Sequence, residues 1–182
     1  MVDTKTRATI KDLYKVEGKA ELVHGEIVHM PPTGDDPGYA SGEIFVHLRD
    51  YTKSTRRGRA YGDGVGFHVN LPHRESLSPD AAYHIGQRTG MRFPEGAPVF
   101  AVEVRSETDY GPAAERAMAA KRADYFACGT LVVWDVDLLS EEVIKSYKAS
   151  DPEHSVIFRR GEIADAEPAV PGWRMTVNDL FE

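Results

Sequence analysis

The sequence has almost no cysteine and no long apolar run. Cys128 is its single cysteine, which excludes an internal disulfide framework and suits a reducing compartment. No apolar stretch approaches the length of a membrane span, and the N-terminus lacks the apolar core of a signal peptide. We therefore expect a cytoplasmic protein that does not insert into membranes.

Positive charge is also scarce. The chain has 22 lysines and arginines against 29 acidic residues, so its formal net charge is −7. Broad, non-specific nucleic-acid binding needs a basic face and is disfavoured by this balance, whereas a local basic groove is compatible with it. The densest basic cluster contains Lys53, Arg56, Arg57 and Arg59. Such a run is more often a solvated helix end than a phosphate-binding site, and we keep Lys53, Arg56 and Arg57 as candidate phosphate contacts.

Three familiar catalytic motifs are missing. The seven histidines form neither H-E-x-x-H nor a tight cluster with cysteine, which argues against a dedicated zinc site. A Ser/His/Asp hydrolase would need a G-x-S-x-G elbow, which the chain lacks. The glycine-rich run at residues 62–66 is followed by neither lysine-serine nor a helical pattern. We interpret that run as a bulge or tight bend rather than a nucleotide-binding loop.

The chain does contain enough apolar material for one core. Its 182 residues, 41% of them hydrophobic, suit a single domain. We predict one domain over residues 1–182, with residues 1–8 frayed. The tail from Pro171 onward is rich in large apolar side chains, so it should pack on the domain or on a second subunit.

Two isolated carboxylates stand in apolar strand patterns. Asp80 lies near the start of a short strand entered through Pro79, where proline costs no ladder hydrogen bond. Glu103 interrupts a near-continuous apolar run at residues 98–105, the pattern of a central strand buried on both faces. An ionised carboxylate there is costly unless it is paired, hydrogen-bonded or bound to a metal. Structural ion pairs with arginines and a functional site both meet that requirement, and the pattern leaves both open.

A lysine follows these carboxylates on a predicted helix. Residues 112–128 are rich in alanine, opened by proline and followed by glycine, which predicts a helix. Met118, Lys121 and Tyr125 are spaced three and four residues apart, so they share one face. If that face packs on the sheet, Lys121 lies at the rim of the core beside the two carboxylates.

A third acidic position lies near the N-terminus. Residues 21–30 alternate around Gly25, which predicts a hairpin. Glu21 is then either an edge-strand charge or a third carboxylate that reaches a site. The alternation alone favours the edge charge.

The order of these features resembles the PD-(D/E)XK nuclease superfamily. Pro79-Asp80 is followed by Glu103-Val104-Arg105 and then by a helical lysine ahead of Val133-Trp134-Asp135. The E-L-x-x-G-E segment that begins at Glu21 and the E-V-x-S segment that begins at Glu103 are similar to those of the Uma-type restriction endonuclease family. The resemblance covers nearly the whole chain and depends on order and spacing rather than on one motif.

The resemblance implies a restriction-endonuclease-like α/β (α+β) fold: a mixed β-sheet core flanked by helices, with an N-terminal hairpin and C-terminal antiparallel strands. It reverses the interpretation of Glu21, which becomes the third site carboxylate, with Glu43 ranked below it. The superfamily's lysine position holds Arg105, which cannot deprotonate and is therefore a candidate phosphate contact rather than a base. Lys121 matches the position to which the family relocates that lysine.

The implied function is metal-dependent hydrolysis of phosphodiester bonds in nucleic acid, expected to be DNA, by an endonuclease that forms a homodimer. Asp80, Glu103 and Glu21 would hold Mg²⁺ or Mn²⁺, hard ions that prefer carboxylate oxygens and lower the pKa of an attacking water. Lys121 would orient that water or neutralise the developing charge. The alternative is a non-catalytic nucleic-acid-binding or protein-interaction module that keeps the fold.

Overall fold

The computed structural model describes residues 7–182 of the chain. Its helices are α1 (Ile10–Leu13), α2 (Asp35–Thr55), α3 (Pro112–Ala127) and the 3-10 helix η1 (Val177–Leu180). Its strands are β1 (Ala20–Val23), β2 (Glu26–His29), β3 (Arg59–Tyr61), β4 (Phe67–Leu71), β5 (Arg74–Leu77), β6 (Ala81–His84), β7 (Phe100–Val104), β8 (Val132–Val136), β9 (Ile144–Lys148), β10 (Asp151–Phe158), β11 (Ile163–Asp165) and β12 (Arg174–Thr176). In this part of the chain no helix is long and apolar enough to cross a membrane.

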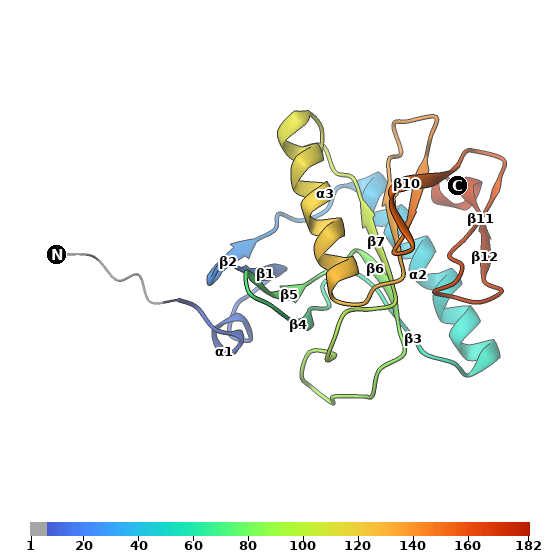
Figure 1. Cartoon of the computed structure of the whole chain (residues 1–182). Helices are drawn as coiled ribbons and strands as arrows, with labels where there is room; N and C mark the ends of the chain where they lie inside the picture. Colours follow the sequence, from blue (N-terminus) through green and yellow to red (C-terminus); the bar gives the residue numbers. More distant parts are fainter. Residues whose placement is uncertain (1–6) are drawn as a thin grey trace.

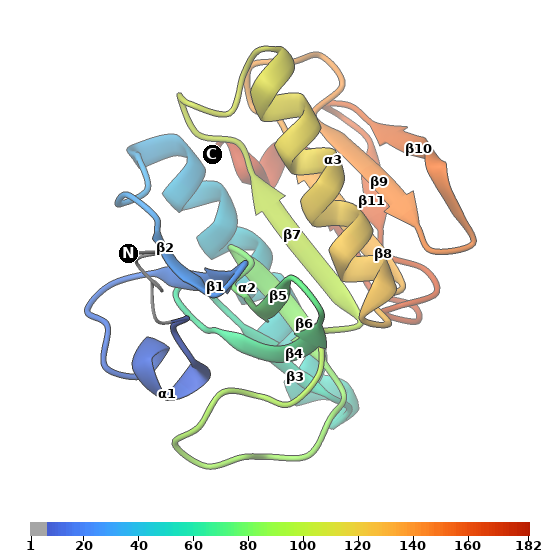
Figure 2. The same ribbon diagram turned by 60° about the vertical axis from the view of Figure 1, so that its left-hand side comes forward.

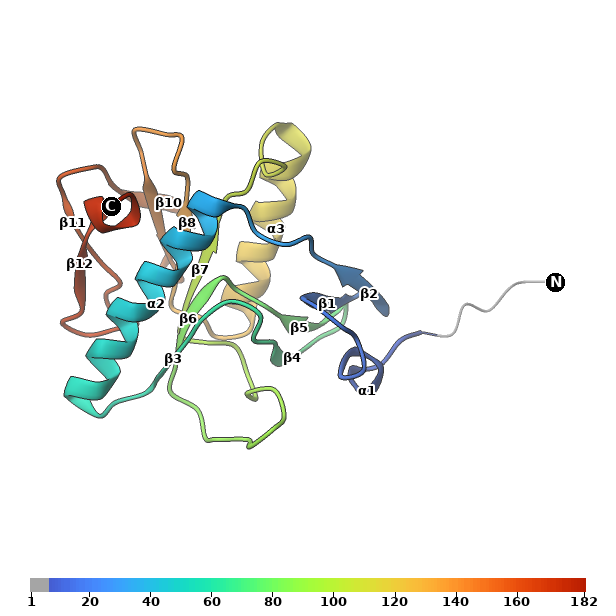
Figure 3. The ribbon, with the colours of Figure 1, turned by 180° about the vertical axis from the view of Figure 1, so that it is seen from behind.

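A six-stranded mixed sheet forms the centre of the molecule, in the order β10-β9-β8-β7-β6-β3 (Figure 1). Strands β7 and β8 are parallel, because α3 connects them as a crossover, whereas the neighbouring pairs are antiparallel. Helix α3 covers one face of this sheet (Figure 2), and α2 covers the other (Figure 3). The predicted mixed sheet, flanking helices and C-terminal antiparallel strands are confirmed.

Side-chain alternation along β7 decides which face Glu103 occupies. Val102 and Val104 belong to the core between the sheet and α2, whereas Ala101 packs with Tyr125 of α3. Because successive side chains point to opposite faces of a strand, Glu103 shares the α3 face with Ala101. The carboxylate therefore lies under α3.

A second sheet, in the order β2-β1-β5-β4, lies beside the first and contains the predicted N-terminal hairpin. The hairpin turns at His24 and Gly25, whose φ angles of 53° and 75° fit the two left-handed positions of a tight turn. Strand β1 is paired on both sides, with β2 and β5. The edge-strand interpretation of Glu21 is therefore wrong, because its strand is internal.

Both chain ends are tied to this framework where the structure describes them. Residues 1–6, most of the segment predicted to fray, lie outside the described residues. Ala8, in the same predicted segment, donates its N–H to the carbonyl of Gly25 at 2.9 Å and is not frayed. At the other end, Trp173 is buried with Trp134 and Phe100, with ring centroids 5.4 and 5.7 Å away. The apolar tail thus packs on its own chain.

Candidate functional site

A cleft of about 410 Å³ opens between the hairpin β1–β2, the end of β7 and helix α3. The four residues predicted to form the site all line this cleft: Glu21, Asp80, Glu103 and Lys121. They come from the second sheet, the main sheet and α3, so the cleft lies where these three parts meet.

Asp80 is held against β7 by two hydrogen bonds. It stands one residue before β6, and its N–H donates to the carbonyl of Val102 at 2.9 Å. Its Oδ2 accepts the N–H of Val104 at 2.7 Å. These two bonds straddle Glu103 on the neighbouring strand, so the two carboxylates are brought to the same part of the cleft.

Glu103 has two hydrogen-bond donors from α3. Lys121 Nζ donates to Oε2 at 2.9 Å, and the Tyr125 hydroxyl donates to Oε1 at 2.6 Å. Burial raises the pKa of Glu103 to about 7; Lys121 opposes that rise, and the charges of Asp80 and Glu21 add to it. The Glu103 carboxyl therefore changes its charge near neutral pH in the metal-free protein.

Lys121 is a shared cation between two carboxylates. Its ammonium lies 3.0 Å from Glu21 Oε1 and 2.9 Å from Glu103 Oε1. Burial alone would lower the pKa of Lys121, but the attraction of Glu103 and Glu21 outweighs burial and raises that pKa. Lys121 is therefore a fixed positive charge rather than a proton acceptor.

Glu21 is the most buried of the three carboxylates, with its side chain 4% exposed. Oε1 accepts the N–H of Ser78 at 2.8 Å, and Oε2 is hydrogen-bonded to Arg74. Arg74 in turn donates to Asp124 at 2.7 Å. Burial raises the pKa of Glu21, but Lys121 and Arg74 outweigh it and lower that pKa, so Glu21 stays ionised.

Sequence patterns did not indicate Arg74 and Asp124 as parts of this network. Neither belongs to a motif, since Arg74 begins a short strand and Asp124 is one of several charged residues on α3. Both are nearly buried, at 9% exposure each. Their pairing depends on α3 crossing over β5, which no local spacing encodes.

Lys19 is a second cation in the cleft that sequence patterns did not indicate. It lies in the loop before β1, and its Nζ is 2.6 Å from Asp80 Oδ1 and 2.6 Å from Asp63 Oδ1. Burial lowers the pKa of Lys19, but the carboxylates of Asp80 and Asp63 outweigh it and raise that pKa. Asp80 therefore faces an ammonium on one oxygen and a backbone N–H on the other.

Arg105 has its donors committed to acidic side chains. Nε and Nη2 each lie 2.8 Å from an oxygen of Asp135, both Nη atoms contact Glu115, and Nη1 also donates to the carbonyl of Asp109. This bidentate arrangement fixes the start of α3 against β8. The contacts give no support to the prediction that Arg105 binds phosphate. A structural pair between Glu103 and Arg105 is also absent, because Glu103 pairs with Lys121.

The basic cluster Lys53, Arg56 and Arg57 is at the C-terminal end of α2 and is exposed. Helix α2 has 21 residues and thus spans about 30 Å, and the segment before its N-terminus lines the cleft. The structure therefore does not bring this cluster to the predicted carboxylates. Glu43, near the middle of α2, does not line the cleft either, which favours Glu21 as the third carboxylate.

The cleft offers donors of the kind that hard divalent cations prefer. Asp80 and Glu103 present carboxylate oxygens, and no histidine or cysteine lines the cleft. Among residues 7–182, however, no three His, Cys, Asp or Glu side chains are gathered closely enough to form a ready metal cage. Ammonium groups instead stand beside the carboxylates, Lys19 beside Asp80 and Lys121 between Glu21 and Glu103. The donor set fits Mg²⁺ or Mn²⁺, provided that an incoming ion replaces an ammonium.

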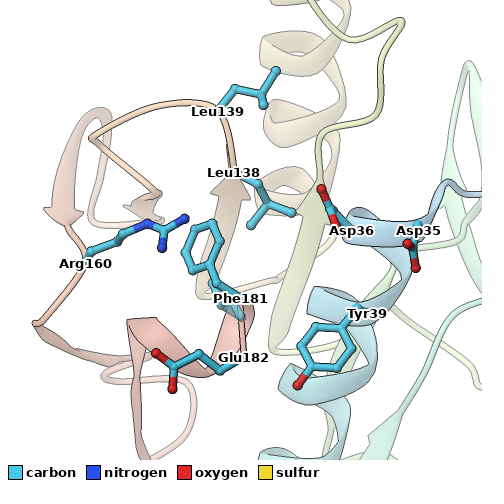
Figure 4. Close-up of a pocket in the computed structure, with 9 residues that line it drawn as sticks. Asp35, Asp36, Tyr39, Leu138, Leu139, Arg160, Phe181 and Glu182 are labelled. Atoms are coloured by element: carbon cyan, nitrogen blue, oxygen red, sulfur yellow. The ribbon is translucent and has the colours of Figure 1, made fainter.

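A second hollow, of about 450 Å³, lies between the N-terminus of α2 and the C-terminus of the chain (Figure 4). Arg160 stacks over the ring of Phe181 at 3.4 Å, and Asp35, Asp36 and Glu182 also line the hollow. The acidic side chains of this hollow outnumber its single arginine, so it is less suited to phosphate than the cleft. The cleft at Asp80 and Glu103 is therefore the better candidate site.

Comparison with known proteins gives one family match and one similar structure. A family model described as "Uma2: Putative restriction endonuclease" matches residues 9–178. A crystal structure of "a putative nuclease belonging to DUF820" from Anabaena variabilis ATCC 29413 is similar, with a TM-score of 0.72 and 17% sequence identity over 95% of this chain and 97% of that chain. At that identity the match shows the shared fold alone. The comparison with curated proteins gives no match.

Proposed function

Because the chain belongs to the Uma2 family of restriction-endonuclease-like proteins, we propose that it is a metal-dependent endonuclease that hydrolyses phosphodiester bonds of DNA. The observation that carries this proposal is the convergence of Asp80, Glu103 and Lys121 in one cleft. Three separate segments contribute to that convergence, the start of β6, strand β7 and helix α3, which is more than a structural ion pair requires.

The charges that line the cleft leave a role for a cation. Four cationic side chains line it, Lys19, Arg74, Arg105 and Lys121, against four carboxylates, Glu21, Asp80, Glu103 and Asp109. A phosphodiester adds negative charge, which this balanced lining does not offset. A divalent ion would supply the missing positive charge, so metal binding would precede substrate binding.

Each residue has a proposed part in the chemistry. Asp80 and Glu103 would hold the ion, since both line the cleft and hard cations prefer carboxylate oxygens as ligands. When bound, the ion would polarise the phosphate and make a water more acidic. Lys121 stays protonated and would neutralise the charge that develops on the phosphate oxygens.

Glu21 has a different proposed part from the other two carboxylates. Its two oxygens already accept hydrogen bonds from Ser78 and Arg74 and face Lys121. As the third carboxylate of the site, it would hold Lys121 in place. It becomes a metal ligand, as the resemblance implies, only when one of these contacts is released.

The decisive experiment is a cleavage assay on single-stranded, duplex and branched DNA, and on RNA, with Mg²⁺ or Mn²⁺. We expect the parent to cleave DNA only with metal, and Asp80→Asn to lose more than the roughly 10–100-fold caused by loss of an outer-shell partner. Asp50→Asn removes the same charge from an exposed site on α2 and should cleave as the parent does. Metal-independent binding without cleavage of any substrate would instead favour the non-catalytic module.

A further inference from the structure

Lys19 occupies an unusual position among the cations of the cleft. Its ammonium lies 2.6 Å from Asp80 on one side and 2.6 Å from Asp63 on the other. Asp80 lines the cleft, whereas Asp63 does not. Lys121 differs in this respect, because both of its carboxylates, Glu21 and Glu103, line the cleft.

Asp63 is built to hold a cation at the edge of the cleft. It stands in the glycine-rich bend between β3 and β4, and its Oδ1 accepts the N–H of Gly64 at 2.7 Å. Gly64 has a φ of +82°, a left-handed conformation that glycine adopts without strain. The Asp63 side chain is 38% exposed against 13% for Asp80, so one of Lys19's two partners is buried and the other is near solvent.

A cation at Asp80 and the ammonium of Lys19 are direct competitors. Oδ2 of Asp80 accepts the N–H of Val104, and Oδ1 faces the ammonium of Lys19, so an ion bound by this carboxylate would lie beside that ammonium. Two positive charges on one carboxylate repel each other strongly in a partly buried site. A metal bound at Asp80 therefore requires Lys19 to withdraw.

We propose that Lys19 is a built-in competitor of the divalent ion for Asp80, and that Asp63 keeps its ammonium paired when the ion displaces it. In the metal-free protein Lys19 neutralises Asp80 and so stabilises a cleft crowded with carboxylates. In the metal-bound protein Lys19 stays on Asp63 at the edge of the cleft. This inference rests on the proposed function, since it assigns Lys19 and Asp63 a role toward the same ion.

The test is the affinity for Mn²⁺, measured by titration calorimetry without nucleic acid. Lys19→Met removes the competing charge and keeps an unbranched stem, so Mn²⁺ should bind about tenfold or more tightly. Asp63→Asn removes the alternative partner of Lys19, so Mn²⁺ should bind more weakly. Lys15→Met removes a lysine whose side chain is 76% exposed, and Mn²⁺ affinity should stay within about twofold of the parent.

The double variant Lys19→Met/Asp63→Asn tests whether Asp63 acts through Lys19 or through its charge alone. If Asp63 acts through Lys19, Asp63→Asn should have little effect in the Lys19→Met background. If Asp63 merely attracts the ion through space, its substitution weakens Mn²⁺ binding equally in both backgrounds, and the role given to Asp63 is wrong. Unchanged or weaker Mn²⁺ binding in Lys19→Met overturns the role of Lys19. Melting temperatures of the metal-free variants verify that each is folded.

Cleavage results distinguish this inference from the proposed function. Suppose that Mn²⁺ binds more tightly in Lys19→Met and more weakly in Asp63→Asn, but that the parent cleaves no nucleic acid. This result would refute the proposed nuclease and support the role of Lys19. A protein that cleaves DNA but binds Mn²⁺ no more tightly in Lys19→Met would refute the role of Lys19 alone. If neither the parent nor Lys19→Met binds Mn²⁺, both the inference and the proposed metal dependence fail.

Discussion

At the scale of single residues, charge at the cleft is controlled by a few short contacts. Lys121 remains an ammonium because two carboxylates outweigh its burial, while Glu103 is pushed toward its neutral form by burial and by neighbouring carboxylates. The cleft thus keeps Lys121 positively charged, whereas the charge of Glu103 changes near pH 7. A bound cation would hold Glu103 in its ionised form.

Glu103→Gln separates electrostatic strain from metal binding. Because the pKa of Glu103 is raised from 4.5 to about 7, the native state binds a proton more tightly than the unfolded state between these values. The metal-free parent should therefore lose stability as pH rises from about 4.5 to about 7, by at most ~1.4 kcal/mol per pH unit. The variant lacks this slope and should be as stable as the parent, or more stable, at pH 8.

Metal should stabilise the parent far more than Glu103→Gln. Mn²⁺ should raise the melting temperature of the parent by mass action, and most of that rise should vanish in Glu103→Gln. Glu153→Gln, at an exposed position of β10, serves as the control and should behave like the parent. A loss of stability in Glu103→Gln with and without Mn²⁺ would mean that Glu103 is a structural partner of Lys121 and Tyr125.

At the scale of elements, the two long helices have different functions. Helix α3 supplies Lys121 and Tyr125 to Glu103, and Asp124 to Arg74, so it organises the cleft. Helix α2 buries Ile44 and Leu48 against the opposite face of the sheet and ends at Thr55, with Arg56 as its C-cap. The basic residues at that end are therefore explained by the helix terminus, where cations are favourable.

Arg56→Gly tests whether the basic end of α2 binds nucleic acid. Arg56 has a left-handed φ of 56°, a conformation that glycine adopts without strain. Its N–H donates to the carbonyl of Thr52 at 2.9 Å. We expect Arg56→Gly to raise the free energy of unfolding by up to about 1 kcal/mol and to leave DNA cleavage unchanged. Arg57→Gly removes the same charge at an ordinary φ and should not stabilise the protein. A severalfold loss of DNA affinity in both variants would restore the phosphate-binding role of this cluster.

At the scale of the whole molecule, the C-terminal segment completes the core. Trp173, Met175, Val177 and Leu180 are each no more than 3% exposed and pack on the face of the main sheet opposite the cleft. The segment stabilises the sheet that positions Glu103 without contributing a residue to the cleft. The homodimer predicted from the family resemblance therefore needs another surface.

Assembly is measured directly by light scattering at micromolar concentration. The proposed homodimer gives twice the chain mass, and a mass of one chain would reject it.

Single-domain organisation, also predicted from the sequence, is measured by following unfolding through tryptophan fluorescence and far-UV circular dichroism. Coincident transitions are expected from one cooperative unit, and two separate transitions would contradict it.

The sequence by itself determined the strand that carries Glu103, the helix that carries Lys121 and the two central carboxylates. Alternation along β7 and helical spacing along α3 are local patterns, and they assign Glu103 and Lys121 to the faces that meet once α3 packs on the sheet. The density of apolar residues after position 171 was likewise sufficient to predict that the tail packs on a folded surface. In each case the information lies within a few residues of the chain.

Only the tertiary structure decided which charges pair. Lys19 meets Asp80 across 61 positions of sequence because the second sheet lies beside the first. Arg74 meets Glu21 across 53 positions because β5 pairs with β1 within the second sheet. The commitment of Arg105 to Asp135, 30 positions later, depends on the parallel register of β7 and β8. Ion pairing depends on distances of a few ångströms between side chains, and no periodicity specifies them when the partners lie on different elements.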